Sequence, residues 1–118
     1  MNFNERVFVL TRAIPPGKVL NYGEVARLLN KPQASRAVGY ALNATPDGAD
    51  VPWHRVVGKI GNYGRISTRA LTYSVDQQRM LLEAEGVIFD EQGLFPLSQY
   101  LWEPDPAELA AIADLFSQ

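Results

Sequence analysis

The sequence predicts a mainly helical domain of the α/β class, built on a winged-helix-like helix-turn-helix unit with short strands. The chain has 118 residues and a hydrophobic fraction of 47%, which suffices for one domain with its own core. Two short amphipathic segments, residues 22–29 and 34–42, flank a tight polar break. Two short strands are predicted after them, at Val56-Val57 and over residues 64–67. We therefore expect residues 1–118 to form a single domain.

A first helix is predicted over residues 4–13, because apolar side chains recur on one helical face at Val7, Leu10 and Ile14. The sequence Pro15-Pro16-Gly17 ends this helix, since neither proline continues it and glycine favours a turn. A short extended link leads from there to the helix pair.

The helix pair begins at Asn21, whose side chain can cap the helix that follows. Glu24, three positions later, has the spacing of a capping box. The second helix carries Ser35 and Arg36 near its N-terminus, where the second helix of such a motif usually meets DNA. Helical hairpins without any DNA function share this pattern, so the pattern alone leaves both interpretations open.

The second half predicts a wing-like hairpin around residues 58–63 and a smaller hairpin around residues 90–93. Between them, Ser74 and Gln77 have capping-box spacing at the start of a helix that runs to about Glu85. Gly86 is expected to end that helix as the first residue beyond it.

A last helix is predicted from Pro106 to Phe116. Asp105 provides its cap, and proline at the first helical position is favourable because the amide hydrogen it lacks has no partner there.

The formal net charge of −2 hides an asymmetry along the chain. Residues 1–69 contain ten Lys and Arg against four Asp and Glu, a net charge of +6. Residues 70–118 contain one basic residue against nine acidic ones, a net charge of −8. A basic first part joined to an acidic second part is typical of a protein with one face for a polyanion. A solvated charge distribution without a partner is the alternative.

The residue inventory argues against several classes of chemistry. The chain has no cysteine and one histidine, which excludes disulfides and thiolate nucleophiles and argues against a zinc site. We expect neither a metal nor any other cofactor. No apolar run has the length of a membrane span, and the N-terminus has no signal-peptide pattern. We therefore expect a cytoplasmic monomer without a membrane partner.

The sequence Pro52-Trp53-His54-Arg55-Val56-Val57 holds the only histidine and one of the two tryptophans. Proline stiffens the backbone before the aromatic residue, and the two valines favour a strand entering the core. Tryptophan is no nucleophile, but its flat ring can stack on an extruded purine. A tryptophan that only fills core volume is the alternative.

Several segments together, in chain order, resemble the DNA-binding domain of O6-alkylguanine-DNA alkyltransferases. They are Ile14-Pro15-x-Gly17-x-Val19, Tyr22-Gly23-Glu24-Val25-Ala26, Ser35-Arg36-Ala37-Val38-Gly39, Pro52-x-His54-Arg55-Val56-Val57 and Leu81-Leu82-x-x-Glu85-Gly86. In the active enzymes the position of Trp53 holds the alkyl-accepting cysteine. Tryptophan there resembles the alkyltransferase-like proteins, as do Ile66-Ser67-x-Arg69 and Tyr100-x-Trp102-x-Pro104.

The resemblance implies that Tyr22, Ser35 and Arg36 bind DNA and extrude a nucleotide. The tyrosine of the family pushes on the phosphate 3′ to the target base, and the arginine enters the stack in place of that base. A planar guanidinium is suited to this because it stacks and donates hydrogen bonds at once.

A lesion pocket is implied at Pro52, Trp53, Ser67 and Arg69, where Arg69 is placed to contact the purine or, alternatively, a phosphate. Lys18, Arg27 and Lys31 are general phosphate candidates, whose contacts would fix position rather than sequence.

Glu85 and His54 match the residues that activate the cysteine through a water molecule in the active enzymes. Without a thiol, we expect them, with Arg55, to form a structural polar support for the pocket. Thr45 stands nearest to the position where the active enzymes have a hinge asparagine, and residues 58–63 look longer than the usual link between the two strands.

The function implied is a non-enzymatic sensor of DNA damage that flips O6-alkylguanine out of duplex DNA and flags it for nucleotide excision repair proteins. Minor-groove docking of the helix pair on bent DNA is part of that expectation. Two alternatives remain. One is a winged-helix regulator that reads sequence in the major groove, and the other is a catalyst that uses His54 and Glu85 as an acid–base pair.

Overall fold

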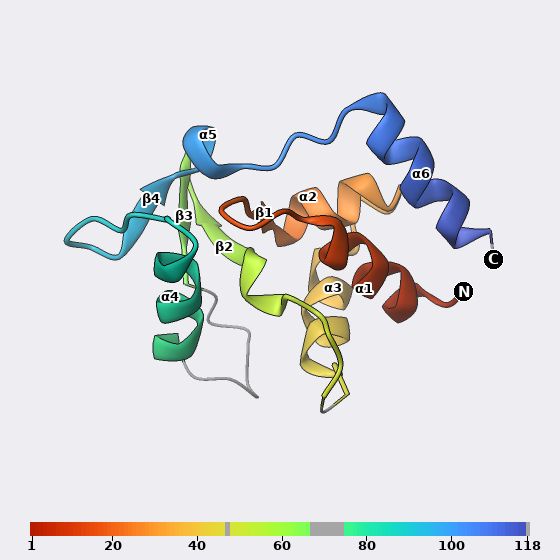
Figure 1. Cartoon of the computed structure of the whole chain (residues 1–118), viewed down its shortest axis with the longest axis horizontal. Helices are drawn as coiled ribbons and strands as arrows, with labels where there is room; N and C mark the ends of the chain where they lie inside the picture. The colour runs from red at the N-terminus through yellow and green to blue at the C-terminus, as the bar shows by residue number, and fades with distance from the viewer. Residues whose placement is uncertain (47, 67–74, 118) are drawn as a thin grey trace.

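The computed structural model describes residues 1–46, 48–66 and 75–117. Six α-helices, one 3₁₀ turn and four short strands follow one another along these residues (Figure 1). Their bounds are α1 Phe3–Ala13, β1 Leu20–Asn21, α2 Tyr22–Leu28, α3 Ser35–Asn43, η1 Trp53–Arg55, β2 Val56–Ile60, β3 Tyr63–Arg65, α4 Val75–Ala84, β4 Leu94–Pro96, α5 Leu97–Tyr100 and α6 Pro106–Phe116. The predicted mainly helical α/β fold with short strands is confirmed.

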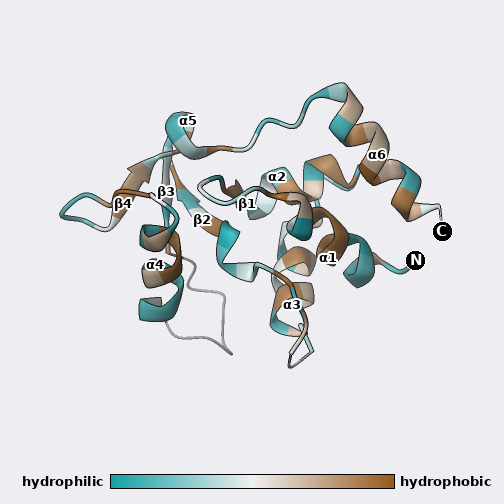
Figure 2. Ribbon diagram, viewed as in Figure 1, coloured by the Kyte–Doolittle hydropathy of each residue, from teal (hydrophilic) through white to brown (hydrophobic). Residues whose placement is uncertain are grey.

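Helices α1, α2 and α3 pack around one hydrophobic core, onto which α6 folds back (Figure 1). Hydrophobic residues colour much of α1 in Figure 2, and Val7 and Leu10 of this helix are buried. Asn2 and Glu5 form a capping box that begins α1. At the other end of the chain, Phe116 of α6 lies under a guanidinium group of α1, which brings the two termini together.

The helix-turn-helix pair is present as predicted. The Asn21 carboxamide oxygen accepts a hydrogen bond from the Glu24 amide at 2.9 Å and so begins α2. The Glu24 carboxylate pairs with Arg27 at 2.7 Å, so it supports the helix through an i,i+3 ion pair. In the break before α3, Asn30 adopts a left-handed conformation with φ of 64°. This turn sets the second helix across the first.

The strands form one sheet in the order β1-β2-β3-β4, with β1 and β2 parallel and the other pairs antiparallel. The expectation of a long link over residues 58–63 is wrong, because Ile60 pairs directly with Tyr63. The remaining two-residue turn has Gly61 at its first position with φ of 57°, where a tight hairpin requires glycine. Of the predicted strand 64–67, Ser67 lies outside the described residues.

The second predicted hairpin, around residues 90–93, is wrong in its strand pairing. Strand β4 pairs with β3, and residues 87–89 form no strand. The Asp90 carboxylate instead accepts hydrogen bonds from the Gln92 and Leu94 amides and closes a local turn. Phe95 pairs with Gly64 of β3, and its ring covers this glycine so closely that a Cβ there would collide with it.

Helix α4 ends as expected at Gly86, which has φ of 99°. The Gly86 amide donates to the Glu83 carbonyl and the Val87 amide to the Leu82 carbonyl, the pair of bonds that defines a Schellman ending. The predicted Ser74 cap lies outside the described residues. Helix α6 has the predicted cap, because Asp105 accepts from the Glu108 amide at 2.8 Å.

The short helix α5 is an addition that the sequence pattern did not predict. No helix among residues 1–46, 48–66 and 75–117 is long and apolar enough to cross a membrane.

Candidate functional site

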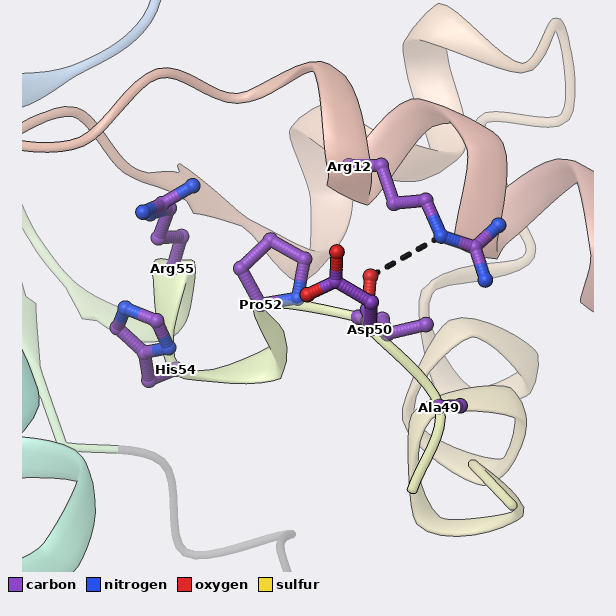
Figure 3. Close-up of a pocket in the computed structure, with 7 residues that line it drawn as sticks. Arg12, Ala49, Asp50, Pro52, His54 and Arg55 are labelled. Atoms are coloured by element: carbon purple, nitrogen blue, oxygen red, sulfur yellow. Dashed lines mark hydrogen bonds between the residues drawn. The ribbon is translucent and has the colours of Figure 1, made fainter. Parts of the chain in front are cut away.

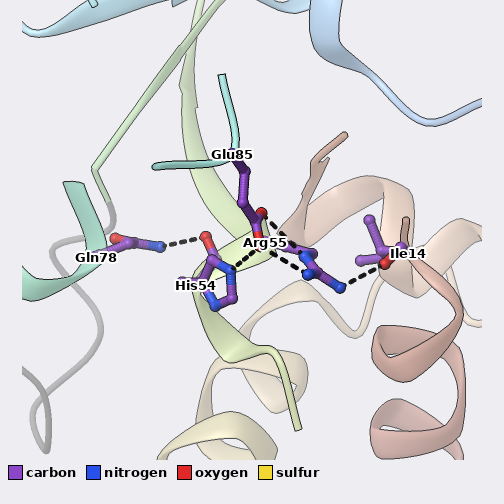
Figure 4. Close-up of polar contacts among 5 residues, drawn as sticks. All are labelled: Ile14, His54, Arg55, Gln78 and Glu85. Carbon is purple, nitrogen blue, oxygen red and sulfur yellow. Dashed lines mark hydrogen bonds and ion pairs between the residues drawn. The ribbon is translucent and has the colours of Figure 1, made fainter. Parts of the chain in front are cut away.

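Three of the predicted site residues, Trp53, His54 and Arg55, form the 3₁₀ turn η1, which leads into strand β2 (Figure 4). The strand expected at Val56 and Val57 is confirmed as the start of β2, directly after this turn. Pro52 precedes the turn, and its fixed φ of −77° leads the backbone into it. The Trp53 and Arg55 amides donate to the Val51 and Pro52 carbonyls, at 2.8 and 3.0 Å. We refer to residues 52–55 as the corner.

One carboxylate holds two side chains of the corner. The Glu85 Oε2 atom lies 3.0 Å from His54 Nε2 and 2.7 Å from an Arg55 terminal nitrogen, and Glu85 Oε1 accepts from Arg55 Nε at 3.1 Å (Figure 4). The other terminal nitrogen of Arg55 donates to the Ile14 carbonyl at 2.8 Å, at the end of α1. The predicted polar support therefore joins α1, the corner and the end of α4.

The electrostatics of this support fix its protonation state. Burial alone would raise the pKa of Glu85, but hydrogen bonds and charge from Arg55 and His54 lower the pKa of that carboxyl to about 2. Burial also lowers the pKa of His54 below its ordinary value of 6.5, against the opposing hydrogen bond to Glu85. At neutral pH the carboxylate can only accept, so the neutral imidazole carries its proton on Nε2.

Gln78 is a second anchor of the corner, and the sequence pattern did not single it out. This side chain is 1% exposed, and its Nε2 atom donates to the His54 carbonyl at 3.2 Å and to the Val56 carbonyl at 2.9 Å. A recognisable signal existed, because Gln78, Leu82 and Glu85 have the i, i+4, i+7 spacing of one helix face. An uncharged polar side chain on the buried face of a helix usually forms hydrogen bonds, most often to backbone groups.

Trp53 is half-buried at the edge of the helical core. Its ring stands nearly perpendicular to the ring of His54, with centroids 6.1 Å apart. A cleft of about 390 Å³ opens beside the corner (Figure 3). Its lining residues are Arg12, Ala49, Asp50, Val51, Pro52, His54 and Arg55. Pro52 thus lines this cleft, whereas Trp53 is not among its lining residues.

The other predicted pocket residues, Ser67 and Arg69, lie outside the described residues, so their place relative to Trp53 stays a prediction. Thr45 is described, and its hydroxyl donates to the Leu42 carbonyl at 2.6 Å. It therefore closes the end of α3, because its bond is made within that helix end rather than to the corner.

The predicted DNA-binding residues lie at the starts of the two helices of the helix-turn-helix unit. Tyr22 is the first residue of α2 and is 7% exposed, so only a small part of its surface is available to a ligand. Ser35 is half-buried at the first position of α3, and Arg36 beside it is exposed. Among the described residues, no three His, Cys, Asp or Glu side chains are grouped to hold a metal ion.

Comparisons with known proteins agree with this arrangement. The sequence model described as the DNA-binding domain of 6-O-methylguanine DNA methyltransferase matches residues 2–87. A protein of Escherichia coli named DNA base-flipping protein is 41% identical over 101 residues, which cover 86% of this chain and 74% of that protein. A methylated-DNA–protein-cysteine methyltransferase of Salmonella typhimurium is 38% identical over 86 residues, which cover 73% of this chain and 47% of that enzyme.

Among solved structures, Atl1 of Schizosaccharomyces pombe superimposes with a TM-score of 0.72 and 36% identity. The match covers 86% of this chain and 95% of that protein, whose complex contains damaged DNA with O6-carboxymethylguanine. The same yeast protein is named alkyltransferase-like protein 1 among the sequence relatives. The residues 2–87 that the sequence model matches include the helix pair, the corner and α4.

Proposed function

The chain belongs to the family of the 6-O-methylguanine DNA methyltransferase DNA-binding domain, together with the base-flipping and alkyltransferase-like proteins, and we propose that it is a non-enzymatic sensor of alkylated guanine in duplex DNA. The observation that carries the proposal is Trp53 on an intact polar support. His54, Arg55 and Glu85 keep their mutual bonds, while the residue presented by the corner cannot accept an alkyl group.

Binding begins with the helix-turn-helix unit, which docks in the minor groove of a bent duplex. Arg36 is exposed at the start of α3 and enters the stack where the lesion leaves it. Tyr22, at the start of α2, crowds the neighbouring phosphate with the small part of its surface that is exposed. The extruded purine then meets Trp53, whose half-buried ring offers a stacking surface.

Selectivity follows from the cost of extrusion. Taking a base out of the duplex costs a few kcal/mol, and an O6-alkylated guanine costs less because it is already weakly paired. A protein with the same pocket contacts for both bases therefore binds the lesion more tightly. No readout of base sequence is required.

No alkyl transfer takes place in this proposal, because the chain contains no cysteine to supply a thiolate. The neutral His54 with its proton on Nε2, directed at Glu85, has no nucleophile to activate. The His54–Glu85 pair therefore orients the corner and does not act as an acid–base couple. A lesion that is held but not repaired must pass to other proteins, and we extend the proposal to nucleotide excision repair on the family resemblance.

A binding titration with two otherwise identical duplexes tests the sensor. One duplex carries guanine and the other O6-methylguanine at a single position, and each is titrated at one fixed salt concentration. We expect the dissociation constant to fall at least tenfold with the lesion. Equal affinity for both duplexes would overturn the sensor and favour a sequence-reading regulator.

The absence of chemistry has its own test. The protein is incubated with duplex DNA that carries a radiolabelled O6-methyl group, and the label is then sought in protein, in solution and in intact DNA. We expect all label to stay on the DNA. Label on the protein or released to solution contradicts the non-enzymatic proposal.

A further inference from the structure

Helix α3 exposes one large aromatic side chain. Tyr40 is 67% exposed, whereas Val38, Ala41 and Leu42 beside it in the helix are buried in the core shared with α1 and α2. Most of the Tyr40 side chain therefore lies outside this core, and its surface is available to a ligand.

Tyr40 lies four residues after Arg36, so the two side chains project from the same face of α3, one turn apart. Both are exposed. We refer to these two residues as the α3 ridge. Arg36, which the proposed function places in the vacated base stack, therefore has Tyr40 one helical turn after it.

The charge around the ridge suits a polyanion. Residues 25–46 contain no Asp or Glu and three basic residues. Of these, Arg27 is paired with Glu24, while Lys31 and Arg36 are exposed and have no ion-pair partner among the described residues. A tyrosine within such a surface can pack its ring on a sugar and donate its hydroxyl to a phosphate.

We infer that Tyr40 is a further DNA-contacting residue, which packs on the sugar-phosphate backbone one helical turn from the flipped nucleotide. This inference rests on the proposed function and assigns different roles to Arg36 and Tyr40. Arg36 acts where the base has left the stack, so it favours the lesion. Tyr40 contacts backbone that every duplex has, so it strengthens binding to damaged and undamaged DNA alike.

The test is a titration of Tyr40→Ala against the paired guanine and O6-methylguanine duplexes. Both dissociation constants are expected to rise by the same factor, about five- to thirtyfold, so their ratio is unchanged. Tyr40→Phe keeps the ring and loses only the hydroxyl, and it should recover most of the affinity. Arg36→Ala, in contrast, is expected to reduce the ratio.

Tyr63→Ala is the matched control, since Tyr63 is another exposed tyrosine, at 47%. It lies on β3, next to the hairpin turn that bonds to α5, and β3 is separate from α3 (Figure 1). This variant should bind both duplexes as the wild type does. A thermal melt of each variant shows that it is folded at the titration temperature.

The outcomes separate the inference from the function on which it rests. If the wild type prefers the lesion and Tyr40→Ala binds both duplexes with wild-type affinity, the inference fails and the sensor stands. If Tyr40→Ala weakens lesion binding alone, Tyr40 belongs to lesion readout and the backbone contact is refuted. If the wild type shows no preference for the lesion, the proposed function itself fails.

Discussion

At the scale of single residues, Arg36 is the side chain whose chemistry separates base replacement from phosphate contact. A lysine in its place keeps the positive charge but has no plane to stack. We expect Arg36→Lys to weaken binding to the lesion duplex about tenfold and binding to undamaged duplex by less than about threefold. Titration of both duplexes measures this. Wild-type affinity in the lysine variant would identify Arg36 as a phosphate contact and reject its role in the stack.

Trp53 offers a direct optical measurement of the pocket. Its ring is half-buried and lies against His54, so an extruded purine that stacks on it changes the environment of the indole. We expect the Trp53 emission to change on addition of lesion duplex and to change much less with undamaged duplex. The measurement requires Trp102→Phe, because Trp102 also emits.

The Trp102→Phe background needs its own control, because Trp102 is buried in the helical core. Its replacement by the smaller phenylalanine lowers the unfolding free energy by about 1–2 kcal/mol. A thermal melt shows whether Trp102→Phe remains folded at the titration temperature. A Trp53 signal that stays constant at saturating lesion duplex would rule out the stacking role.

At the scale of elements, α4 holds the corner through its two ends. Gln78 near its start bonds to the backbone of η1 and β2, and Glu85 just beyond its end bonds to the side chains of His54 and Arg55. The corner also reaches α1 through the Ile14 carbonyl. Hydrogen bonds thereby connect α1, the corner, β2 and α4, which fixes where Trp53 is presented.

Glu85→Gln should reveal this connection as a stability that depends on pH. The variant leaves Arg55 without its charge partner, and we expect it to lose about 2 kcal/mol of unfolding free energy at pH 7, less than for a fully buried pair because the site is partly exposed. The folded-state pKa of Glu85 is about 2, below the ordinary 4.5. The stabilisation is therefore complete above pH 4.5 and is lost as the pH falls toward 2.

Denaturant unfolding of both proteins between pH 2 and pH 7 measures this difference. The gap between wild type and Glu85→Gln should shrink below pH 4.5. His54 adds a loss of stability below pH 6.5 in both proteins, because burial lowers its pKa and favours the neutral form in the folded state. Glu85 opposes this effect by raising the pKa of His54, so the His54 loss is larger in Glu85→Gln and the gap widens slightly below pH 6.5 before it shrinks. A gap that stays constant down to pH 2 contradicts the ion pair as its cause.

The same elements show which parts of the fold the sequence can predict. Helix starts and ends are local, so Asn21, Asp105 and Gly86 were identified from spacing alone and are confirmed. Strand partners are not local. The pairing of β4 with β3 depends on the ring of Phe95 against Gly64, a contact between residues 31 positions apart that no sequence period encodes.

The candidate site also has parts that the sequence predicts and parts that it does not. The pairing of His54 with Glu85 bridges 31 residues and followed from the family resemblance rather than from any periodicity. Gln78 was not predicted as an anchor of the corner, because its side chain bonds to backbone carbonyls. Every residue has such a carbonyl, so no sequence pattern marks the acceptors. The strand predicted at Val56 and Val57 is confirmed, whereas the η1 turn before it was not predicted, because Pro52 is compatible with either an extended or a helical continuation.

At the scale of the whole molecule, the basic first part of the chain predicts how binding depends on salt. Each phosphate neutralised by a cation contributes about −0.9 to the slope of log K against log salt concentration. Lys31 is exposed in the turn before α3, whereas Arg27 is already paired with Glu24 at 2.7 Å. Of these two cations, Lys31 is therefore the one whose charge is available to a phosphate.

We expect Lys31→Ala to weaken binding to lesion and undamaged duplexes by the same factor and to reduce the salt slope by about one. Arg27→Ala is the matched comparison and should change the slope by much less, because that variant also releases the Glu24 carboxylate from an existing pair. Titrations at four or five salt concentrations give both slopes. A slope unaffected by Lys31→Ala would mean that this turn stays away from the backbone and that α3 meets the duplex through its ridge alone.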